Sequence, residues 1–507
     1  MSLSIIDAIR DPNLLGASFK DLSTWRAWLV VLRALFGLPM DDAADLELFT
    51  QCTGLTAPPA EGTREGVIVA GRRSGKSFIS AVIAVYLACF RDWTPYLSPG
   101  ERGMIFIIAT DRLQAQIIKR YVSGIFSASP VLSRMIEKET QDEIHLRSRV
   151  TVAVKTCSFR TIRGYTVLCA ILEETAFWRS EESANPDREV LQALRPALST
   201  TGGYMILIST PYSRRGILWE LHRKHYGQPG RTLVWQAPSV TMNPTLDPAV
   251  IEAALLDDPQ AARSEWLAEW RADIETYLGL EQVEPCVVPD RGELSRVKGV
   301  EYSAFMDPSG GRRDSFSCAL CHVEKKSGKV IIDVLRERRP PFKPSEVVAE
   351  FSTLLKSYDV MAAVSDRYGG EWVTEAFRAH GVMVEPSELS ASELYVELVP
   401  LVLNGAVELP DDKRLIAQLT SLERRTRSGG KDVISHYPGS HDDLANAAAG
   451  AVVMTSRAAV DAGPIFVQTK RTIVRYGDRY GDADVQPIGG GDFEGRFREW
   501  QRTVKKI

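Results

Sequence analysis

The stretch Ala70-Gly-Arg-Arg-Ser-Gly-Lys-Ser77 decides the fold of the first half of this chain. The apolar run Gly66–Ala70 before it predicts a short buried strand, and the run Phe78–Ala88 after it predicts a helix. A strand, a glycine-bearing turn and Gly-Lys-Ser at the start of a helix form the architecture of a phosphate-binding loop. The alternative, an ordinary strand-to-helix turn, does not explain the Gly-Lys-Ser ending.

Each position of this loop has an expected role. Gly71, Ser74 and Gly75 are expected to form a turn whose backbone N–H groups surround phosphate oxygens. Lys76 is expected to reach the β and γ phosphates, and the Ser77 hydroxyl to ligate Mg²⁺. The loop therefore predicts that the chain binds a nucleoside triphosphate, ATP, together with Mg²⁺.

Two arginines and one alanine distinguish this loop from the general pattern. Arg72 and Arg73 have no evident structural purpose, and one of them could stabilise charge on the transferring phosphoryl group, as an arginine finger does. The alternative is that both are simple surface arginines. Ala70 stands where the pattern usually has its first glycine, so the strict motif fails by one methyl group.

The bulk composition is that of a large globular protein. At 507 residues, two or three domains are expected. The net charge is −4, so contact with nucleic acid would have to come from a local basic surface.

The seven cysteines are scattered, and Cys318-Ala-Leu-Cys321 fits a buried strand better than a metal or redox pair. With no signal pattern and no apolar run long enough to span a bilayer, we expect a cytoplasmic protein without membrane contact.

The alternation of apolar runs predicts an α/β protein. From Glu61 to Pro211, strands alternate with helices, which favours a mostly parallel sheet covered on both faces. After a region rich in proline and glycine the pattern restarts with three consecutive strands, followed by a helix and a buried strand. That order indicates a ribonuclease-H-like α/β domain. The expected divisions are an N-terminal helical segment (1–60), an ATPase domain (61–280), a linker (281–299), the second domain (300–462) and a poorly packed tail (463–507).

Paired carboxylates follow a predicted strand of the first domain. The run Val167–Leu172 ends in Glu173 and Glu174, a pattern typical of Mg²⁺-nucleotide hydrolysis beside a phosphate loop. Glu173 is expected to organise the hydration shell of Mg²⁺, and Glu174 to polarise the attacking water as catalytic base. The alternative is a strand end that reaches solvent. Ile208-Ser-Thr-Pro211 also follows a buried strand, which would place Thr210 near the γ-phosphate.

Four aspartates of the second half are candidate metal ligands. Asp307 and Asp366 each end a predicted strand, where an unpaired buried charge is costly, and Asp442 and Asp443 open the last predicted helix. Together they would bind two divalent ions that position a phosphodiester for hydrolysis. Helix capping is the alternative for the last pair, and it explains only one of them.

Two neighbours of these aspartates have open roles. Asp314 is either a fourth ligand or a turn residue. His441 is a ligand, a proton carrier or a surface histidine.

The ordered set of motifs resembles the large terminase subunits of tailed bacteriophages. The resemblance covers roughly residues 60 to 455. It is carried by the following segments, in this order: Ala70–Ser77, Leu172–Glu174, Ser209–Pro211, Asp307, Ser365–Asp366 and His441-Asp-Asp-Leu-Ala-Asn446. Two departures are Ala70 for glycine and Glu173 for the usual aspartate.

The resemblance implies a DNA-packaging enzyme of a phage or prophage. It implies an N-terminal ATPase that translocates double-stranded DNA into a procapsid, and a C-terminal Mg²⁺-dependent nuclease, with Mn²⁺ as a possible substitute, that cuts concatemers. The implied partners are a portal protein, a small terminase subunit and further copies of the chain in a ring on the procapsid. The implied location is the cytoplasm of the bacterial host.

Two other functions share some of these features. An ATP-dependent helicase or translocase has the same loop and acidic strand, but a two-lobed helicase carries a second ATPase-like half. A domesticated prophage protein that only binds DNA would lack catalysis. The segment Arg424-Arg-Thr-Arg-Ser-Gly-Gly-Lys431 is a candidate DNA-binding loop, with a solvated turn as the alternative.

Overall fold

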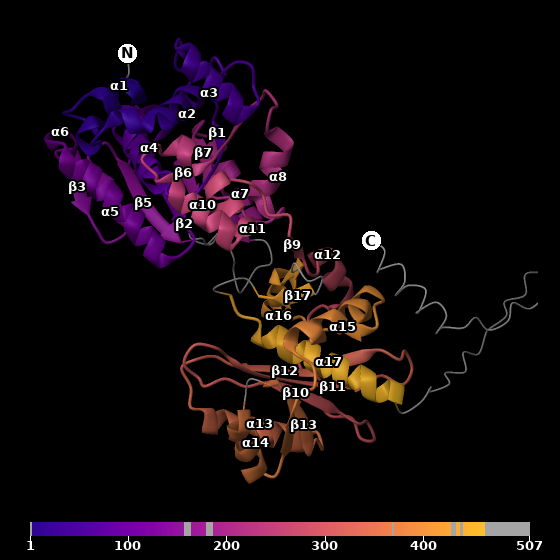
Figure 1. Ribbon diagram of the computed structural model, residues 1–507. Coiled ribbons are helices and arrows are strands. Elements are labelled where there is room, and N and C mark those ends of the chain that lie inside the picture. The colour runs from indigo at the N-terminus through magenta and orange to yellow at the C-terminus, as the bar shows by residue number, and fades with distance from the viewer. Residues whose placement is uncertain are drawn as a thin grey trace, which may run out of the picture. The chain divides into compact units, whose positions relative to one another are not determined.

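The computed structural model describes residues 3–156, 164–178, 186–367, 370–426, 432–436 and 440–461 (Figure 1). The expected C-terminal tail and residues 427–431 of the candidate DNA-binding loop lie outside these ranges, so neither expectation is tested. Within them, no helix has the length and apolar character that crossing a membrane requires.

An eight-stranded sheet forms the centre of the first half. Its strands follow the order β3-β4-β5-β2-β6-β7-β1-β8, and the six from β5 to β8 are parallel. The predicted mostly parallel sheet is therefore confirmed. The strands are β1 (Glu65–Ala70), β2 (Gly103–Ala109), β3 (Ile136–Glu139), β4 (Glu143–Leu146), β5 (Val150–Thr156), β6 (Thr166–Glu173), β7 (Tyr204–Ser209) and β8 (Thr232–Ala237).

Both faces of this sheet are covered, because successive strand residues point to opposite sides. Ile68 and Ala70 of β1 face a core shared with α2 (Arg26–Phe36), α4 (Lys76–Phe90) and α5 (Arg112–Ala128). Val67 and Val69 face the opposite core, shared with α7 (Pro186–Ser199) and α8 (Gly216–His225). Continuous apolar strands are what such a doubly covered sheet requires.

The N-terminal residues are part of this first core. The expected helices are present as α1 (Ile5–Arg10), α2 and α3 (Ala43–Thr53). Trp28 of α2 is fully buried and belongs to the same cluster as Ile68 of the sheet. These helices therefore stabilise the strand that leads into the phosphate-binding loop. Three further helices follow the sheet: α9 (Ser239–Met242), α10 (Pro248–Asp257) and α11 (Pro259–Leu267).

A six-stranded sheet with the order β14-β13-β10-β11-β12-β15 forms the second half. β10, β11 and β12 are consecutive antiparallel strands, and β13 joins β10 in parallel, as the ribonuclease-H-like pattern predicts. The strands are β10 (Ser303–Asp307), β11 (Phe316–Val323), β12 (Val330–Arg338), β13 (Ala362–Ser365), β14 (Met383–Pro386) and β15 (Val407–Glu408).

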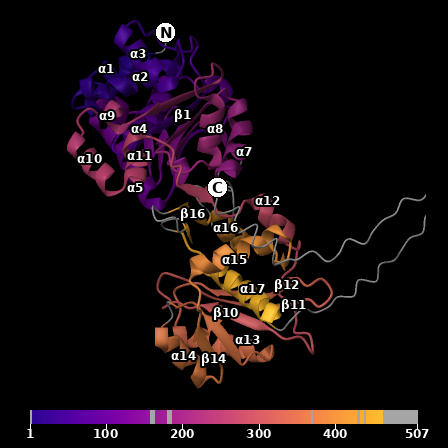
Figure 2. The ribbon, with the colours of Figure 1, turned by 45° about the vertical axis from the view of Figure 1, so that its right-hand side comes forward.

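Helices cover this sheet on both faces (Figures 1 and 2). α15 (Ala391–Leu403), α16 (Lys413–Ser421) and α17 (Asp443–Asp461) lie on one side, and α13 (Pro344–Ser357) and α14 (Gly370–Ala379) on the other. α17 approaches β10 closely because Gly450 faces the ring of Phe305, where any Cβ would collide. This approach brings the first turn of α17 to the end of β10 that carries Asp307.

A third, three-stranded sheet is built from segments that are far apart in the chain. β9 (Ile274–Thr276) pairs with β16 (Glu423–Thr426), which pairs with β17 (Asp432–Ser435). Within the expected linker, α12 (Leu280–Val283) is helical, and Val283 and Cys286 are buried in the core of the second sheet. The domain boundaries expected from the sequence stay predictions.

Candidate nucleotide site and candidate metal centre

The loop between β1 and α4 has an unusual backbone. Gly75 caps α4 with φ +86°, and Arg73 has φ +60°, a left-handed conformation that is rare outside glycine. A Cβ on Gly71 would meet Ser239 and lie 2.8 Å from the carbonyl oxygen of Trp266. Ala70, by contrast, is the last residue of β1, and its side chain is buried in the core. The glycine that the turn requires is therefore Gly71.

The side chain of Lys76 lies between this loop and the segment that follows β7. Its Nζ donates to the carbonyl oxygens of Ala70 (3.2 Å) and Gly71 (3.0 Å) and to the hydroxyl of Thr210 (2.7 Å). It also lies 3.4 Å from Oε1 of Glu174. Residues at the ends of β1, β6 and β7 and at the start of α4 thus meet at the carboxyl edge of the sheet, as the sequence predicts.

Glu173 is buried beneath the loop with no exposed surface. Its carboxylate accepts from the hydroxyl of Ser77 (2.8 Å) and from the hydroxyl of Ser80. Burial raises the pKa of Glu173 to about 7, and the nearby charge of Glu174 adds to that rise. The predicted magnesium ligand Ser77 and the first carboxylate are therefore in direct contact.

Glu174 is held by the segment that leaves β7. Its Oε2 accepts from the Ser209 hydroxyl (3.2 Å) and from the backbone N–H of Thr210 (3.1 Å), while its own backbone has φ +53°. The segment that contains Ser209 and Thr210 therefore contacts both the candidate base Glu174 and Lys76.

A cavity of about 510 Å³ opens at this edge of the sheet. It is lined by Arg72, Glu174 and Thr210, together with Arg271 and Arg425. Arg72 is exposed, and its guanidinium lies 3.4 Å from Glu265. Arg73 is exposed as well. Whether either acts on a phosphoryl group stays a prediction.

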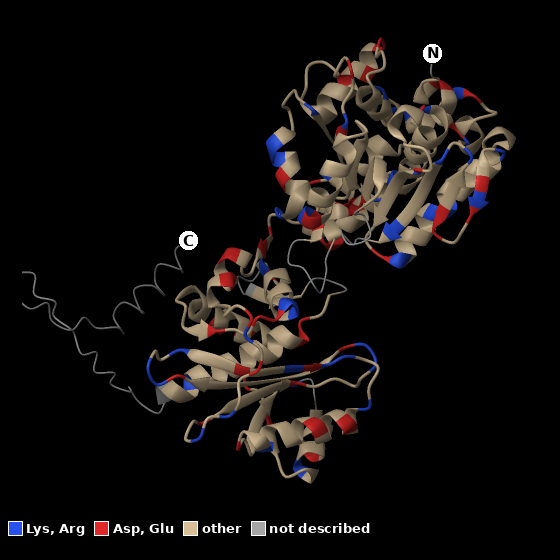
Figure 3. Cartoon of the chain, turned by 180° about the vertical axis from the view of Figure 1, so that it is seen from behind, with Lys and Arg blue, Asp and Glu red and all other residues tan. Residues whose placement is uncertain are grey.

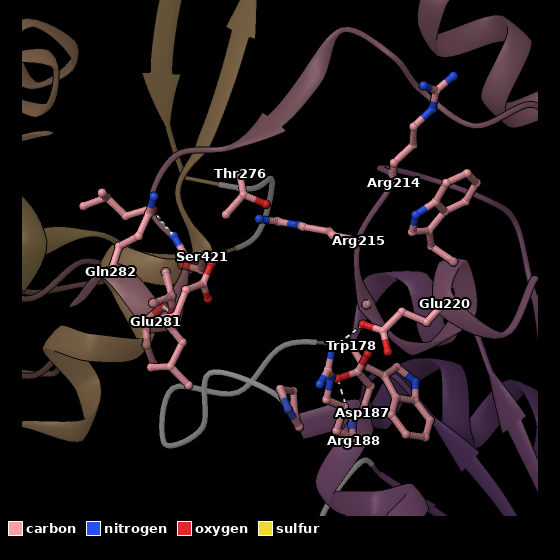
Figure 4. A pocket seen from close by; sticks show the side chains of 18 of the residues that line it. Trp178, Asp187, Arg188, Arg214, Arg215, Glu220, Thr276, Glu281, Gln282 and Ser421 are labelled. Atoms are coloured by element: carbon pink, nitrogen blue, oxygen red, sulfur yellow. Dashed lines mark hydrogen bonds and ion pairs between the residues drawn. The ribbon is translucent and has the colours of Figure 1, made fainter. Parts of the chain in front are cut away.

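A larger cavity, of about 760 Å³, lies elsewhere (Figure 4). Arg215, in the turn before α8, and Glu281 of α12 lie on opposite sides of it. Its lining includes no residue of the phosphate-binding loop, neither of the paired glutamates and none of the four aspartates that are candidate metal ligands. The smaller cavity is therefore the candidate nucleotide site.

The second-half aspartates gather around the first turn of α17. Nδ2 of Asn446 donates to Oδ2 of Asp307 (3.0 Å) and to Oδ2 of Asp366 (2.9 Å), and so joins the ends of β10 and β13. Burial raises the pKa of Asp307 well above its usual range, and the charges of Asp443 and Asp366 raise it further. The three acids that the sequence places on separate elements therefore lie within electrostatic reach of one another.

Asp442 and Asp443 have different surroundings. Asp442 accepts from the Tyr395 hydroxyl (2.8 Å), and burial raises its pKa. Asp443 accepts from the backbone N–H of Ser315 (3.3 Å), and burial raises its pKa to about 6. His441, one of the open candidates, pairs with Asp314 at 3.2 Å.

The donors at both sites fit the groups that the motifs predict. Carboxylate and amide oxygens suit a hard divalent cation, and Oδ1 of Asn446 is a buried acceptor without a hydrogen-bond partner. The aspartates do not form a complete metal-binding site in this conformation. Within the described ranges, no group of three or more His, Cys, Asp or Glu side chains lies close enough together to hold a metal ion. At the loop, Ser77 and Glu173 offer hydroxyl and carboxylate oxygens.

Two of these functional contacts were missed by the sequence reasoning. Asn446 lies three residues after Asp443 and four after Asp442, a spacing that places all three on neighbouring turns of one helix. Ser80 bears the same relation to Ser77 at the start of α4. Helical spacing was therefore a usable signal in both cases.

Comparisons with known proteins found similar chains of one kind. No family model matches the chain. Terminase large subunits of Thermus phage G20c and Thermus virus P23-45 are each 25% identical to it, over 424 and 426 residues respectively, covering 74% of this chain and 81% of the relative. The crystal structure of the HK97 bacteriophage large terminase aligns with 85% of this chain and 99% of that chain, at 18% identity and a TM-score of 0.36. The chain is thus similar, over most of its length, to bacteriophage terminase large subunits.

Proposed function

We propose that this chain is a terminase large subunit, which hydrolyses ATP to move double-stranded viral DNA into a procapsid and cuts that DNA with a metal-dependent nuclease. The observation that carries the proposal is the presence of both sites in one chain, each at the carboxyl edge of its own sheet. The 25% identity to terminase large subunits spans 424 residues and supports the same reading.

In the proposed ATPase, the loop residues Gly71–Ser77 bind the phosphates, with Lys76 neutralising their charge. Ser77 and Glu173 would hold Mg²⁺, which neutralises phosphate charge when bound. Glu174 accepts a proton from the attacking water, and its contacts with Ser209 and Thr210 orient it for that role. Arg72 or Arg73 would stabilise the charge that develops on the transferring group.

In the proposed nuclease, Asp307, Asp366, Asp442 and Asp443 would hold divalent cations, Mg²⁺ or Mn²⁺, which polarise a phosphodiester when bound. Asn446 keeps Asp307 and Asp366 together. Because burial raises the pKa of Asp307, Asp442 and Asp443, cutting is expected to need a pH at which these three carboxyls are ionised.

The proposed partners are double-stranded DNA, a portal protein, a small terminase subunit and further copies of this chain, in the cytoplasm of the bacterial host. Basic and acidic residues are both scattered over the elements in Figure 3, and the net charge of the chain is −4. DNA contacts would therefore be local and mostly to phosphates, and they would weaken steeply with salt.

A helicase is the less favoured function. Its second half would repeat the ATPase fold, whereas here the second sheet has antiparallel strands at its centre and no phosphate-binding loop in the described residues. A protein that only binds DNA would gain nothing from the buried acids.

Two substitutions separate the proposed activities. Lys76→Ala is expected to abolish ATP hydrolysis and leave Mg²⁺-dependent cutting of plasmid DNA, and Asp366→Ala the reverse. If Lys76→Ala hydrolyses ATP at the wild-type rate, the motor assignment fails. Cutting that survives Asp366→Ala would remove the nuclease assignment.

A further inference from the structure

Three side chains outside the sequence motif donate hydrogen bonds to backbone carbonyls of the phosphate-binding loop. The carbonyl oxygen of Ser74 accepts from the indole N–H of Trp28 (2.6 Å). The carbonyl oxygen of Arg73 accepts from Nδ2 of Asn243 (2.9 Å), and that of Arg72 from the hydroxyl of Ser239 (2.7 Å). Three consecutive carbonyls of the loop are thus each bound by a different side chain, from α2, from α9 and from the residue that follows α9.

These contacts also fix the direction of three N–H groups. In a planar trans peptide, the C=O of one residue and the N–H of the next point in opposite directions. Holding the carbonyls of Arg72, Arg73 and Ser74 therefore turns the N–H groups of Arg73, Ser74 and Gly75 to the other side. Within the ranges that the structure describes, none of these three N–H groups has a hydrogen-bond partner.

The loop needs such support because its backbone is strained. Arg73 lies in the left-handed region, and Gly75 has φ +86°. The ring of Trp25 occupies the space beside Gly75, 2.7 Å from where a Cβ would be. Residues of the N-terminal segment thus restrict the loop both by a hydrogen bond and by contact.

We propose that Trp28, Ser239 and Asn243 are positioning residues, which hold the loop in the conformation whose N–H groups can bind phosphate. The inference rests on the proposed ATPase and extends it, because it assigns a role in nucleotide binding to the N-terminal segment. Each residue acts through the loop carbonyl to which it donates a hydrogen bond. Removing one contact frees a peptide group to rotate, which lowers the fraction of molecules whose N–H groups are ready for phosphate.

The expected effect is a loss of affinity rather than of chemistry. We expect Trp28→Phe, which keeps the buried ring and removes the N–H, to raise KM for MgATP and Kd for MgADP about five- to tenfold. The kcat should fall about twofold or less, because Lys76 and Glu174 are untouched. Asn243→Ala should behave in the same way, and because Asn243 is only partly buried the variant is expected to fold.

Matched controls exist for both substitutions. Trp93 is also buried and donates its indole N–H to a backbone carbonyl, that of Leu87 (2.8 Å), away from the loop. Trp93→Phe should therefore lower thermal stability about as much as Trp28→Phe and leave KM unchanged. Thr245→Val removes the hydroxyl contact to Oδ1 of Asn243 (2.7 Å) and keeps the donor that reaches Arg73.

The experiment measures ATPase kinetics, MgADP binding and thermal unfolding for the full chain and these four variants. A rise in KM and Kd limited to Trp28→Phe and Asn243→Ala supports the inference. KM within twofold of wild type in both, or an equal rise in the two controls, overturns it and leaves the proposed ATPase intact. A wild-type chain that binds no MgADP and hydrolyses no ATP overturns the proposed function, and the inference with it.

Discussion

Replacing Glu173 by glutamine is expected to make the protein more stable at neutral pH while removing its ATPase activity. Glu173 is completely buried, and its carboxylate accepts hydrogen bonds from the hydroxyls of Ser77 and Ser80. Glutamine has the same shape and stays neutral at every pH. The substitution therefore removes a buried charge and little else.

The pKa of Glu173 sets the size and sign of this effect. Burial raises it to about 7, from an ordinary value of 4.5. Between these values the folded protein binds a proton that the unfolded chain has released, so stability falls as the pH rises from about 4.5 to about 7. At about 1.4 kcal/mol per pH unit, the loss by pH 8 is of the order of 3 kcal/mol. Glu173→Gln does not suffer this loss.

Urea unfolding of the full chain at pH 5 and pH 8, in EDTA and without nucleotide, tests the prediction. Trp178 reports on the region, because its indole donates to the carbonyl oxygen of Glu173 (2.8 Å). The stability difference between Glu173→Gln and wild type should grow by about 2 to 3 kcal/mol from pH 5 to pH 8. If both proteins lose the same stability over this range, Glu173 is not protonated near neutral pH and the reasoning is wrong.

Three further predictions follow from named contacts. Gly71→Ala places a methyl group against Ser239 and 2.8 Å from the carbonyl oxygen of Trp266. It should therefore lower the free energy of unfolding, measured by thermal unfolding, by about 1–3 kcal/mol and abolish nucleotide binding. An unchanged KM for ATP would contradict this. Because the pKa of Asp443 is raised to about 6, kcat/KM for Mg²⁺-dependent DNA cutting should rise as the pH increases through about 6, and a profile that is flat from pH 5 to pH 8 would argue against a role for this carboxylate. Asn446→Leu removes the donor that joins two aspartates, so DNA cutting should fall at least tenfold while ATP hydrolysis in the same preparation stays at the wild-type rate.

Local patterns in the sequence were enough to predict both sheets and to name candidate residues for both sites. The loop, the paired glutamates and the aspartates at strand ends are each defined by a few consecutive residues, and the carboxyl edge of a sheet brings such residues together. The apparent irregularity at Ala70 also has a local explanation. Its methyl group packs in the core behind β1, and the close approach that demands glycine occurs one residue later, at Gly71.

What the sequence could not predict are contacts between distant segments. Trp28 lies 46 residues before its partner in the loop, and Asn243 lies 170 residues after its own. The residue spacing around Trp28 or around Asn243 does not indicate a contact with the loop. The helical pattern around Trp28 indicates only that one face of the helix is buried. Such contacts depend on how helices pack against the sheet, and they became visible only with the structure.

The charges of the two sites argue that function, rather than stability, keeps these acids in place. Lys76 is the cation beside Glu174, but Glu173 is held by two neutral hydroxyls. At the second sheet, the hydrogen bonds to Asp307 and Asp443 come from an amide and a backbone N–H, which are also neutral. Buried carboxylates with neutral donors have raised pKa values and destabilise the folded state at neutral pH, so apolar or amide residues of the same size would give a more stable protein. Only a cation that binds there during function would offset that cost, which is why buried acids at strand ends point to catalytic sites more strongly than any other feature of this sequence.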